Sequence, residues 1–237
     1  MSAHNLNMPP NDALRSIYET GLVVLEDGST RPVTSASSPA ESAAMYAWLT
    51  ANPPEVAVEI GMAYGLSALT MLTAMEKNRR GKLISIDPYI QFDSARRSAL
   101  LAIEKSGLAM RHQHRHEKSE LALPALVAEG VQADFVYIDG HHGFDHAFVD
   151  MFYADRLVPV GGVIAFDDTG WRAVHKVIHY MLRHRRYDEL DVGLPRISQS
   201  TNPIKTLIKR LQGRFGPSRY FRKTDDWQPP VSFFRSF

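Results

Sequence analysis

The sequence predicts an α/β fold: a doubly wound, mostly parallel seven-stranded sheet with helices on both faces and an antiparallel C-terminal edge. Two observations support this. Between Val56 and about His184, apolar runs of strand length alternate with amphipathic runs of helix length. Several strand-length runs are almost continuously hydrophobic, as expected when helices cover both faces of a parallel sheet. A chain of 237 residues is long enough to bury one such core.

Two helices are expected before the sheet begins. The first covers residues 12–20 and stops at Gly21, which stands where a left-handed C-cap is expected. The second begins after Ser38, because Pro39 suits the first turn and Glu41 completes a capping box. These helices predict an N-terminal cap or lid.

The α/β region follows in a regular order. Strands are expected over 56–60, 82–87, 110–116, 134–139 and 162–167. Helices are expected near 66–77, 93–106, 119–129, 144–156 and 171–184. Three further runs, 187–192, 218–224 and 231–237, have the pattern of shorter strands that would add the antiparallel edge. The predicted domains are therefore a cap over 1–54 and the α/β domain over 55–237.

Charge is distributed unevenly along the chain. Residues 176–237 carry 13 Lys/Arg against five Asp/Glu, although the formal net charge of the whole chain is only +1. Much of this excess falls in a basic helical insertion predicted at about 198–217. A solvated helix face, attraction of an acidic acceptor, and peripheral contact with a membrane or a partner all remain open explanations. Nucleic acid is not an expected partner, because no recognition motif accompanies the charge.

The composition excludes several kinds of protein. Without cysteine there are no disulfides and no thiolate zinc site. The N-terminus lacks the basic start and apolar run of a signal peptide, and no segment approaches the ~20 apolar residues that cross a bilayer. We therefore expect a cytoplasmic protein without a transmembrane segment, and homo-oligomers remain open.

Acidic side chains stand where the predicted parallel strands end. They are Glu59 at the end of the first strand, Asp87 at the end of the second, Asp139 at the end of the fourth, and Asp167 and Asp168 at the end of the fifth. Ligand sites of open α/β sheets lie at this edge. Each aspartate alone would be interpreted as a helix N-cap, but clustered carboxylates repel one another and require a cation or hydroxyl donors.

A glycine turn follows the first strand. Gly61 and Gly65 allow the backbone to approach a ligand, and the helix N-terminus behind them suits a carboxylate or phosphate. Asp87, after the next strand, is placed to accept hydrogen bonds from a ribose diol. Dehydrogenases use the same devices, but hydride transfer has no need of three further carboxylates opposite the cofactor.

Four segments resemble a known family. VAVEIGMAYGLSAL, KLISIDPY, DFVYIDGHHGFDHAFVDM and LVPVGGVIAFDD are similar to the successive motifs of class I S-adenosylmethionine-dependent methyltransferases, over roughly residues 37–182. They are most similar to the small metal-dependent O-methyltransferases, which include catechol and caffeoyl-CoA enzymes and the sugar O-methyltransferases of macrolide biosynthesis. The resemblance implies a Rossmann-like methyltransferase fold, the cofactor S-adenosylmethionine, a divalent cation and a small-molecule hydroxyl acceptor.

The resemblance also implies the site residues, position by position. Those expected to bind the cofactor are Glu59, Gly61, Tyr64, Gly65, Ser67, Asp87, Ser119 and Asp139. Among them, Glu59, Gly61 and Gly65 would line the methionine end of the cofactor. Asp87 would bind the ribose, and Ser119 would lie near the adenine. Those expected to hold the cation are Asp139, Asp167 and Asp168. Because this donor set is all oxygen, Mg²⁺ is the expected ion.

Two residues depart from the catechol-type pattern. His142 stands where those enzymes commonly have a lysine, and Asp168 where they commonly have an asparagine. Both features are closer to the sugar O-methyltransferase branch. We therefore expect methyl transfer to a hydroxyl of a sugar or natural-product intermediate, with a catechol or phenol O-methyltransferase as the alternative. A cofactor-binding module without turnover is the alternative from another class.

His142 is the expected catalytic base, together with Asp139. At pH 7 an alcohol with pKa near ~16 costs about 12 kcal/mol to ionise, against about 4 kcal/mol for a phenol near ~10. A cation can lower the pKa of the hydroxyl, and an imidazole can take its proton. His141 is expected only as a neighbour of substrate or cofactor. Trp171 would either roof the acceptor pocket or pack on the core.

Other histidines have less specific spacings. His112, His114 and His116 alternate and would share one face of a strand, where we favour an edge facing water over a metal site. His175 and His179 lie one helical turn apart, but the glutamate of the HExxH zinc motif is missing. Neither group is expected to bind metal.

Overall fold

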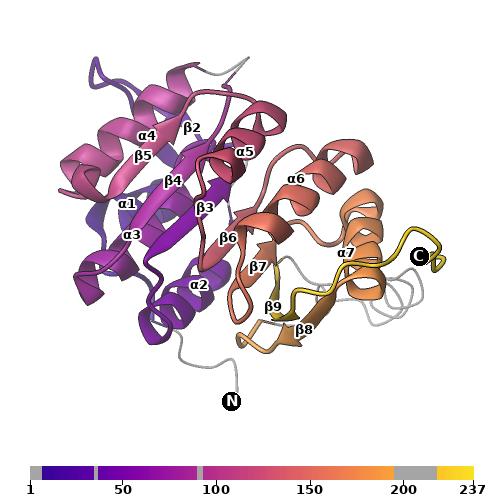
Figure 1. Cartoon of the computed structure of the whole chain (residues 1–237). Helices are drawn as coiled ribbons and strands as arrows, with labels where there is room; N and C mark the ends of the chain where they lie inside the picture. Colours follow the sequence, from indigo (N-terminus) through magenta and orange to yellow (C-terminus); the bar gives the residue numbers. More distant parts are fainter. Residues whose placement is uncertain (1–6, 35–36, 90–92, 195–217) are drawn as a thin grey trace, which may run out of the picture. The chain divides into compact units, whose positions relative to one another are not determined.

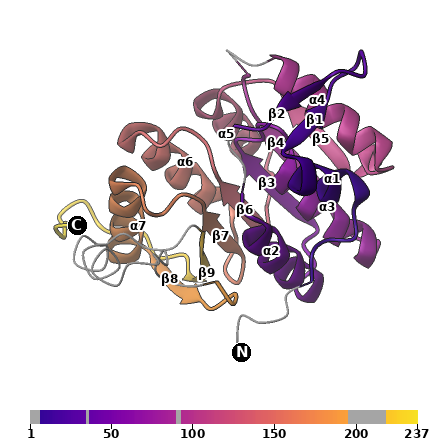
Figure 2. The same ribbon diagram turned by 180° about the vertical axis from the view of Figure 1, so that it is seen from behind.

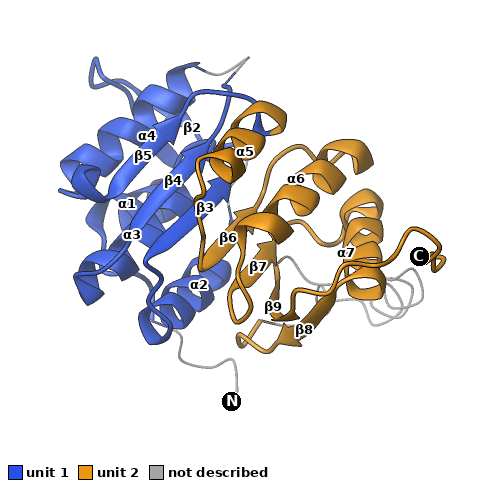
Figure 3. Ribbon diagram, in the orientation of Figure 1, with its two compact units in different colours: residues 1–119 blue, residues 120–237 orange. Residues whose placement is uncertain are grey.

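The computed structural model describes residues 7–34, 37–89, 93–194 and 218–237 (Figure 1). Contacts divide the chain into two compact units, residues 1–119 and 120–237 (Figure 3), and we describe each unit by itself. The basic helical insertion predicted at about 198–217 lies outside the described residues.

The chain begins with a helix and a hairpin. Helix α1 (Asp12–Thr20) has the predicted bounds: the side chain of Asn11 caps its first turn, and Gly21 ends it in the left-handed region at φ 69°. Strands β1 (Leu22–Val24) and β2 (Thr30–Pro32) then form a short antiparallel hairpin. The hairpin is not among the predicted elements.

Helix α2 (Pro39–Ala51) begins with the predicted capping box. Ser38 Oγ accepts the N–H of Glu41 at 3.3 Å, and the Glu41 carboxylate accepts the N–H of Ser38 at 2.8 Å. Both α1 and α2 pack against α3 (Leu66–Asn78), which is buried along most of its length; Figure 2 shows the three helices grouped together. The role of residues 1–54 as a lid stays a prediction.

The first unit contains three parallel strands. Strands β3 (Val56–Ile60), β4 (Lys82–Ile86) and β5 (His112–Arg115) lie in the order β5-β4-β3, so β5 is the edge strand. Helix α4 (Asp93–Lys105) connects β4 toward β5 and contacts α3. In this register Glu59 of β3 stands beside Ser85 of β4. The strands β3 and β4 are nearly all buried, as their hydrophobic runs predict.

The second unit contains a mixed sheet. Strands β6 (Phe135–Ile138) and β7 (Val163–Phe166) are parallel, and all their residues are buried. Strand β9 (Arg219–Asp225) runs antiparallel to β7, and β8 (Arg186–Leu190) runs antiparallel to β9, which gives the order β6-β7-β9-β8. The antiparallel C-terminal edge is therefore confirmed. Together, β3 to β9 supply the seven strands of the predicted fold class.

Three helices accompany the sheet of the second unit. Their bounds are α5 (Ser119–Ala128), α6 (Phe144–Leu157) and α7 (Arg172–His184). Helix α6 joins the two parallel strands and packs against α7. No helix in the described part of the chain has both the length and the apolar composition that a membrane span needs.

The prediction of a strand over 231–237 is wrong. This segment has no strand partner, and it packs along α7 instead. Its backbone groups bond to side chains: Arg235 N–H donates to His184 Nε2 at 3.1 Å, and Lys176 Nζ donates to the carbonyl of Phe237 at 2.7 Å. Ring contacts of His184 with Phe233 and Phe237 accompany these bonds. The aromatic side chains of this segment therefore pack on a helix and do not line one face of a sheet.

A buried ionic cluster joins α6 to the antiparallel strands. The carboxylate of Asp155, which is fully buried, accepts hydrogen bonds from Arg185 Nε at 2.9 Å and Tyr187 Oη at 2.8 Å. Lys223 Nζ lies 3.5 Å from the same carboxylate. Burial by itself would raise the pKa of Asp155, but the charge of Lys223 and the hydrogen bonds outweigh burial and lower it.

Candidate functional site

The glycine turn after β3 needs its glycines for geometric reasons. Gly61 and Gly65 lie in the left-handed region, at φ 86° and φ 80°, and Gly65 is the N-cap of α3. A Cβ at Gly65 would lie 2.9 Å from the Cβ of Ala99 on α4. Only glycine therefore allows both this backbone conformation and the close packing of α3 on α4. The ring of Tyr64 in the same turn is buried.

The predicted cofactor residues Glu59 and Ser67 contact each other. Glu59 is completely buried; its carboxylate accepts Ser67 Oγ–H at 2.5 Å and Ser85 Oγ–H at 2.6 Å. These bonds join β3, β4 and the first turn of α3. Both side chains thus support the turn from behind, and their contact with a cofactor stays a prediction.

Asp87 follows β4 and holds the glycine turn. Its Oδ2 accepts the backbone N–H groups of Met62 and Ala63, both at 2.9 Å, and its Oδ1 accepts the N–H of Tyr89 at 2.9 Å. The carboxylate therefore lies directly against the turn, and its contact with a ribose stays a prediction. An ionised carboxylate has about four acceptor positions, so Oδ1 retains room for a further donor.

Tyr89 closes the same turn and was not singled out from the sequence. Its hydroxyl donates to the carbonyl of Ala63 at 2.8 Å, and its side chain is buried. Burial first, and then the charge of Asp87, raise the pKa of Tyr89, so its hydroxyl remains a donor. Both Tyr89 and Ala63 have positive φ, at 46° and 43°. Ser119 is half-buried at the start of α5.

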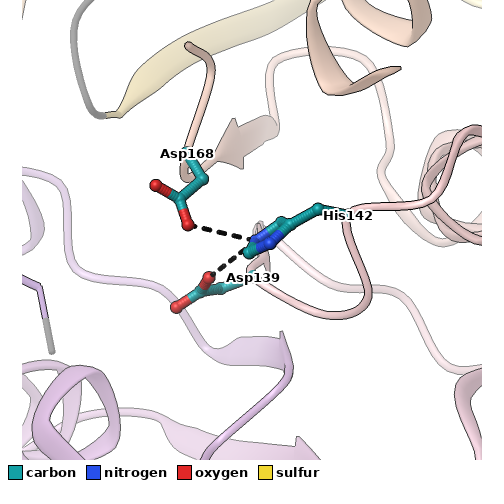
Figure 4. Close-up of side chains that lie close together, drawn as sticks. All are labelled: Asp139, His142 and Asp168. Carbon is teal, nitrogen blue, oxygen red and sulfur yellow. Dashed lines mark ion pairs between the residues drawn. The ribbon is translucent and has the colours of Figure 1, made fainter. Parts of the chain in front are cut away.

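The second unit brings together Asp139, His142 and Asp168 (Figure 4). Asp139 follows β6, His142 stands in the loop before α6, and Asp168 follows β7. One potential ligand atom from each residue lies within 4.8 Å of the others. In the described part of the chain, no other set of three histidine or acidic side chains meets this spacing.

His142 lies between the two carboxylates. Its Nε2 is 3.2 Å from Asp168 Oδ2 and 3.8 Å from Asp139 Oδ1. The carboxylate of Asp139, and next the charge of Asp168, raise the pKa of His142 against the opposing effect of partial burial. The three side chains are between about a quarter and a half exposed, at 26%, 33% and 48% for Asp139, His142 and Asp168. A ligand can therefore reach them.

Asp167 does not belong to this cluster. Its side chain is buried, and its Oδ1 accepts the hydroxyl of Ser218 at 2.7 Å. Asp168 turns the other way because its backbone lies in the left-handed region at φ 50°, which aspartate tolerates better than most residues. The structure thus places His142 beside two of the predicted metal ligands, where the sequence analysis expected Asp167. The hydrogen bond between Asp167 and Ser218 was not predictable, because these residues are 51 positions apart.

An aromatic ring covers His142. Trp171 is stacked on it, with ring centroids 5.7 Å apart and planes at 9°, and 59% of the Trp171 side chain is exposed. His141 is occupied elsewhere: its Nδ1 accepts the N–H of Gly143 at 3.0 Å, and its ring contacts His146. Of the two adjacent histidines, His142 is therefore the one directed at the carboxylates.

The other histidines form no metal cluster among the described residues. The preference for an edge strand at 110–116 is confirmed by β5. The expectation that its histidines face water is wrong for His112 and His114, which are partly buried and contact β4. His175 and His179 pack ring against ring on α7, 4.3 Å apart.

Comparisons with known proteins agree with this fold. Residues 58–169 match the family model described as a methyltransferase domain. Two Arabidopsis thaliana proteins that carry the name caffeoyl-CoA O-methyltransferase are 32% identical over 114 residues and 35% identical over 130 residues. These matches cover 48% of this chain and 46% and 47% of the relatives, so the chain spans about half the length of each.

Solved structures share the fold at low sequence identity. The O-methyltransferase TomG of Streptomyces achromogenes, involved in tomaymycin synthesis and solved with S-adenosylmethionine, has TM-score 0.61 and 16% identity over 80% of this chain and 82% of that one. The methyltransferase PaMTH1 of Podospora anserina, solved with S-adenosylhomocysteine, has TM-score 0.63 and 18% identity over 90% and 88%. The family model and the two relatives show that about half of the chain is similar to methyltransferases, and the solved structures show that the chain has the same fold.

Proposed function

We propose that the chain transfers the methyl group of S-adenosylmethionine to a hydroxyl of a small molecule, with help from a divalent cation. The observation that carries the proposal is the grouping of Asp139, His142 and Asp168, three potential ligands within 4.8 Å, in a chain that is similar to methyltransferases over about half of its length. The names of the relatives point to the same reaction, O-methylation.

The first unit would bind the cofactor. Gly61 and Gly65 shape a turn that a ligand can approach, and the N-terminus of α3 behind them suits the carboxylate of the methionine end. Asp87 would accept a ribose hydroxyl at the free position of Oδ1. Glu59 and Ser67, with Tyr64, would support this turn, and Ser119 would lie near the adenine.

The cation would be held by the carboxylates of Asp139 and Asp168, and His142 would stay beside them as the base. The donor set fits, because one oxygen of each carboxylate lies within 4 Å of Nε2 of His142, so the three side chains face one another. Two carboxylates leave the remaining coordination positions to water or substrate oxygens, which suits Mg²⁺ and Mn²⁺. When bound, a divalent cation supplies charge that lowers the pKa of a nearby hydroxyl.

His142 would hold and move the proton. The acceptor oxygen attacks the methyl carbon, the carbon–sulfur bond breaks, and the hydroxyl proton passes to Nε2 of the neutral imidazole. The products are the methyl ether, S-adenosylhomocysteine and a proton that His142 later releases. Asp139 and Asp168 would stabilise the imidazolium during this step, since both lie within 4 Å of Nε2.

The presence of a base, His142, bears on which class of acceptor the chain methylates. An alcohol is harder to ionise than a phenol and needs a proton acceptor beside the cation. We therefore favour a sugar or natural-product alcohol over a catechol or another phenol. The exposed ring of Trp171, stacked on His142, offers a flat apolar face for the acceptor.

The test is a panel of sugar alcohols, natural-product alcohols and catechols, with S-adenosylhomocysteine release as the readout. We expect S-adenosylhomocysteine to be released with alcohols. A chelator should lower this release, and Mg²⁺ or Mn²⁺ should restore it. His142→Gln should abolish it, while His146→Gln, on the adjacent helix face, should not. Release with catechols alone would favour the phenol alternative. Cofactor binding without release for any acceptor would favour the non-catalytic module.

A further inference from the structure

Three alternating histidines, two in the edge strand β5 and one just after it, contact β4 and the segment that follows β4. His112 Nε2 lies 3.0 Å from Ser85 Oγ, His114 Nε2 lies 3.3 Å from the carbonyl oxygen of Asp87, and His116 Nε2 lies 2.9 Å from the carbonyl oxygen of Pro88. We call these three residues the histidine ladder. Each rung contacts β4 or the segment that follows it.

Two rungs satisfy backbone groups that the sheet leaves without a partner. The last backbone hydrogen bond between the two strands runs from the N–H of Asp87 to the carbonyl of Arg115, at 3.2 Å. The carbonyls of Asp87 and Pro88 follow this point, where β5 has ended. A carbonyl oxygen only accepts hydrogen bonds, so Nε2 of His114 and of His116 must carry the hydrogen.

The ladder fixes the segment that presents Asp87. On one side, the Asp87 carboxylate accepts three backbone N–H groups from the glycine turn and Tyr89. On the other side, its own peptide is held by His114. The orientation of the carboxylate is therefore determined by both sides, and it leaves the free acceptor position on Oδ1 in a defined direction.

Tyr89 couples His114 to the glycine turn. The two rings meet edge to face, with centroids 5.5 Å apart, and the Tyr89 hydroxyl donates to Ala63. Its positive φ of 46° is strained for a tyrosine and persists only because neighbouring contacts hold it. The pKa of His114 is lowered, mainly by partial burial of the ring, so the ring is neutral at pH 7.

We infer that His114 and His116 are positioning residues for the cofactor, which fix the peptide at 87–89 so that Asp87 presents its carboxylate to the ribose hydroxyls. The inference rests on the proposed function, in which Asp87 binds the ribose. It assigns the alternating histidines a role that neither metal binding nor an edge facing water describes.

Binding rather than turnover tests this role. Titration calorimetry would measure the Kd of S-adenosylhomocysteine and of its 2′,3′-dideoxy analogue for the wild type and for His114→Leu, His114→Gln, His116→Ala and Gln113→Ala. Gln113 is the matched control, because it is exposed on the other face of the same strand. In the wild type, removing the ribose hydroxyls should weaken binding by about tenfold or more.

His114→Leu should weaken S-adenosylhomocysteine by about fivefold to tenfold, yet barely change the Kd of the dideoxy analogue, because the lost contact is the one to the hydroxyls. His114→Gln keeps an N–H donor and should restore most of the affinity. His116→Ala should act in the same direction, more weakly, and serves if the His114 variants do not fold. Gln113→Ala should match the wild type.

Two results would overturn the inference. Equal weakening of both ligands by His114→Leu would mean that the histidine acts on folding alone, and unchanged affinity would mean that it does not position Asp87. A wild-type chain that binds neither ligand would contradict the proposed function itself, so the two failures are distinguishable.

Discussion

Nε2 of His142 lies 3.2 Å from Oδ2 of Asp168, although the two residues follow different strands of the second unit. The left-handed backbone of Asp168 directs this carboxylate to the imidazole, while its neighbour Asp167 bonds to Ser218. This pairing places an imidazole beside two of the three aspartates that were expected to hold the cation.

Asp168→Asn should reduce divalent-cation affinity by roughly 100-fold, because the amide oxygen that replaces the carboxylate carries no net charge and binds a divalent cation more weakly. Calorimetric titration with Mn²⁺ in the absence of cofactor would measure this. Asp145→Asn, an exposed aspartate in the first turn of α6, is the matched control and should leave the affinity unchanged. Equal affinities of the Asp168 variant and the wild type would remove Asp168 from the metal site.

Asp155→Asn should lower the free energy of unfolding by about 3 kcal/mol, because Arg185 would then be buried without a carboxylate and Lys223 would keep only its pair with the exposed Asp226. Urea unfolding would measure the change. Glu55→Gln is a matched control: it removes a pair of similar length to that of Arg185 and Asp155, 2.8 Å to Arg80, between two exposed side chains, and should cost less than ~1 kcal/mol. Similar losses in both variants would contradict a special role for the buried cluster.

Gly65→Ala should destabilise the first unit by about 2 kcal/mol, since the new Cβ would have both a strained φ of 80° and a 2.9 Å approach to Ala99. Gly107→Ala separates the two causes. Gly107 also has a positive φ, 71°, but nothing lies within 4 Å of its added Cβ, so this variant should lose only about 1 kcal/mol. Thermal unfolding of both variants would check the difference, and an equal loss would exclude the packing contribution.

Stability should fall as the pH drops from about 6.5 to 4. Burial first, and then the charge of His114, lower the pKa of His112 to about 4, so in this range the unfolded chain binds a proton that the folded chain does not. The stability that the neutral His112 allows is fully present above pH 6.5. By pH 4 the free energy of unfolding should have fallen by about 3 kcal/mol because of His112.

His112→Gln should flatten this pH dependence, although part of it should remain because burial also lowers the pKa of His175 to about 4. Urea unfolding at pH 4 to 7 would compare the variant with the wild type. An unchanged slope in the variant would show that His112 is not the group responsible.

Local rules predicted most of the fold. The capping box at Ser38 and the left-handed stop at Gly21 depend on neighbouring residues only, and the structure confirms both. The prediction of a strand over 231–237 was wrong for the opposite reason. A short apolar and aromatic run indicates a strand when taken alone, but here a distant helix, α7, supplies both the packing surface and the hydrogen-bond partners.

The candidate site was predictable in part. Asp139, Asp168 and His142 follow strand ends, and strand ends can be located from hydrophobic runs. The exclusion of Asp167 depends on Ser218 and on the φ of Asp168, which no spacing reports. Likewise, the alternation of the histidine ladder was visible, but its targets were not, because they depend on where β5 ends relative to β4.

Methyl transfer is measured most directly by mass spectrometry of the acceptor after incubation with trideuteriomethyl-labelled S-adenosylmethionine and Mg²⁺ or Mn²⁺. We expect labelled methyl ether from the wild type and from His146→Gln, and none from His142→Gln or Asp168→Ala, although both inactive variants still bind S-adenosylhomocysteine. Undiminished labelling by His142→Gln in the presence of a chelator would contradict the proposed function.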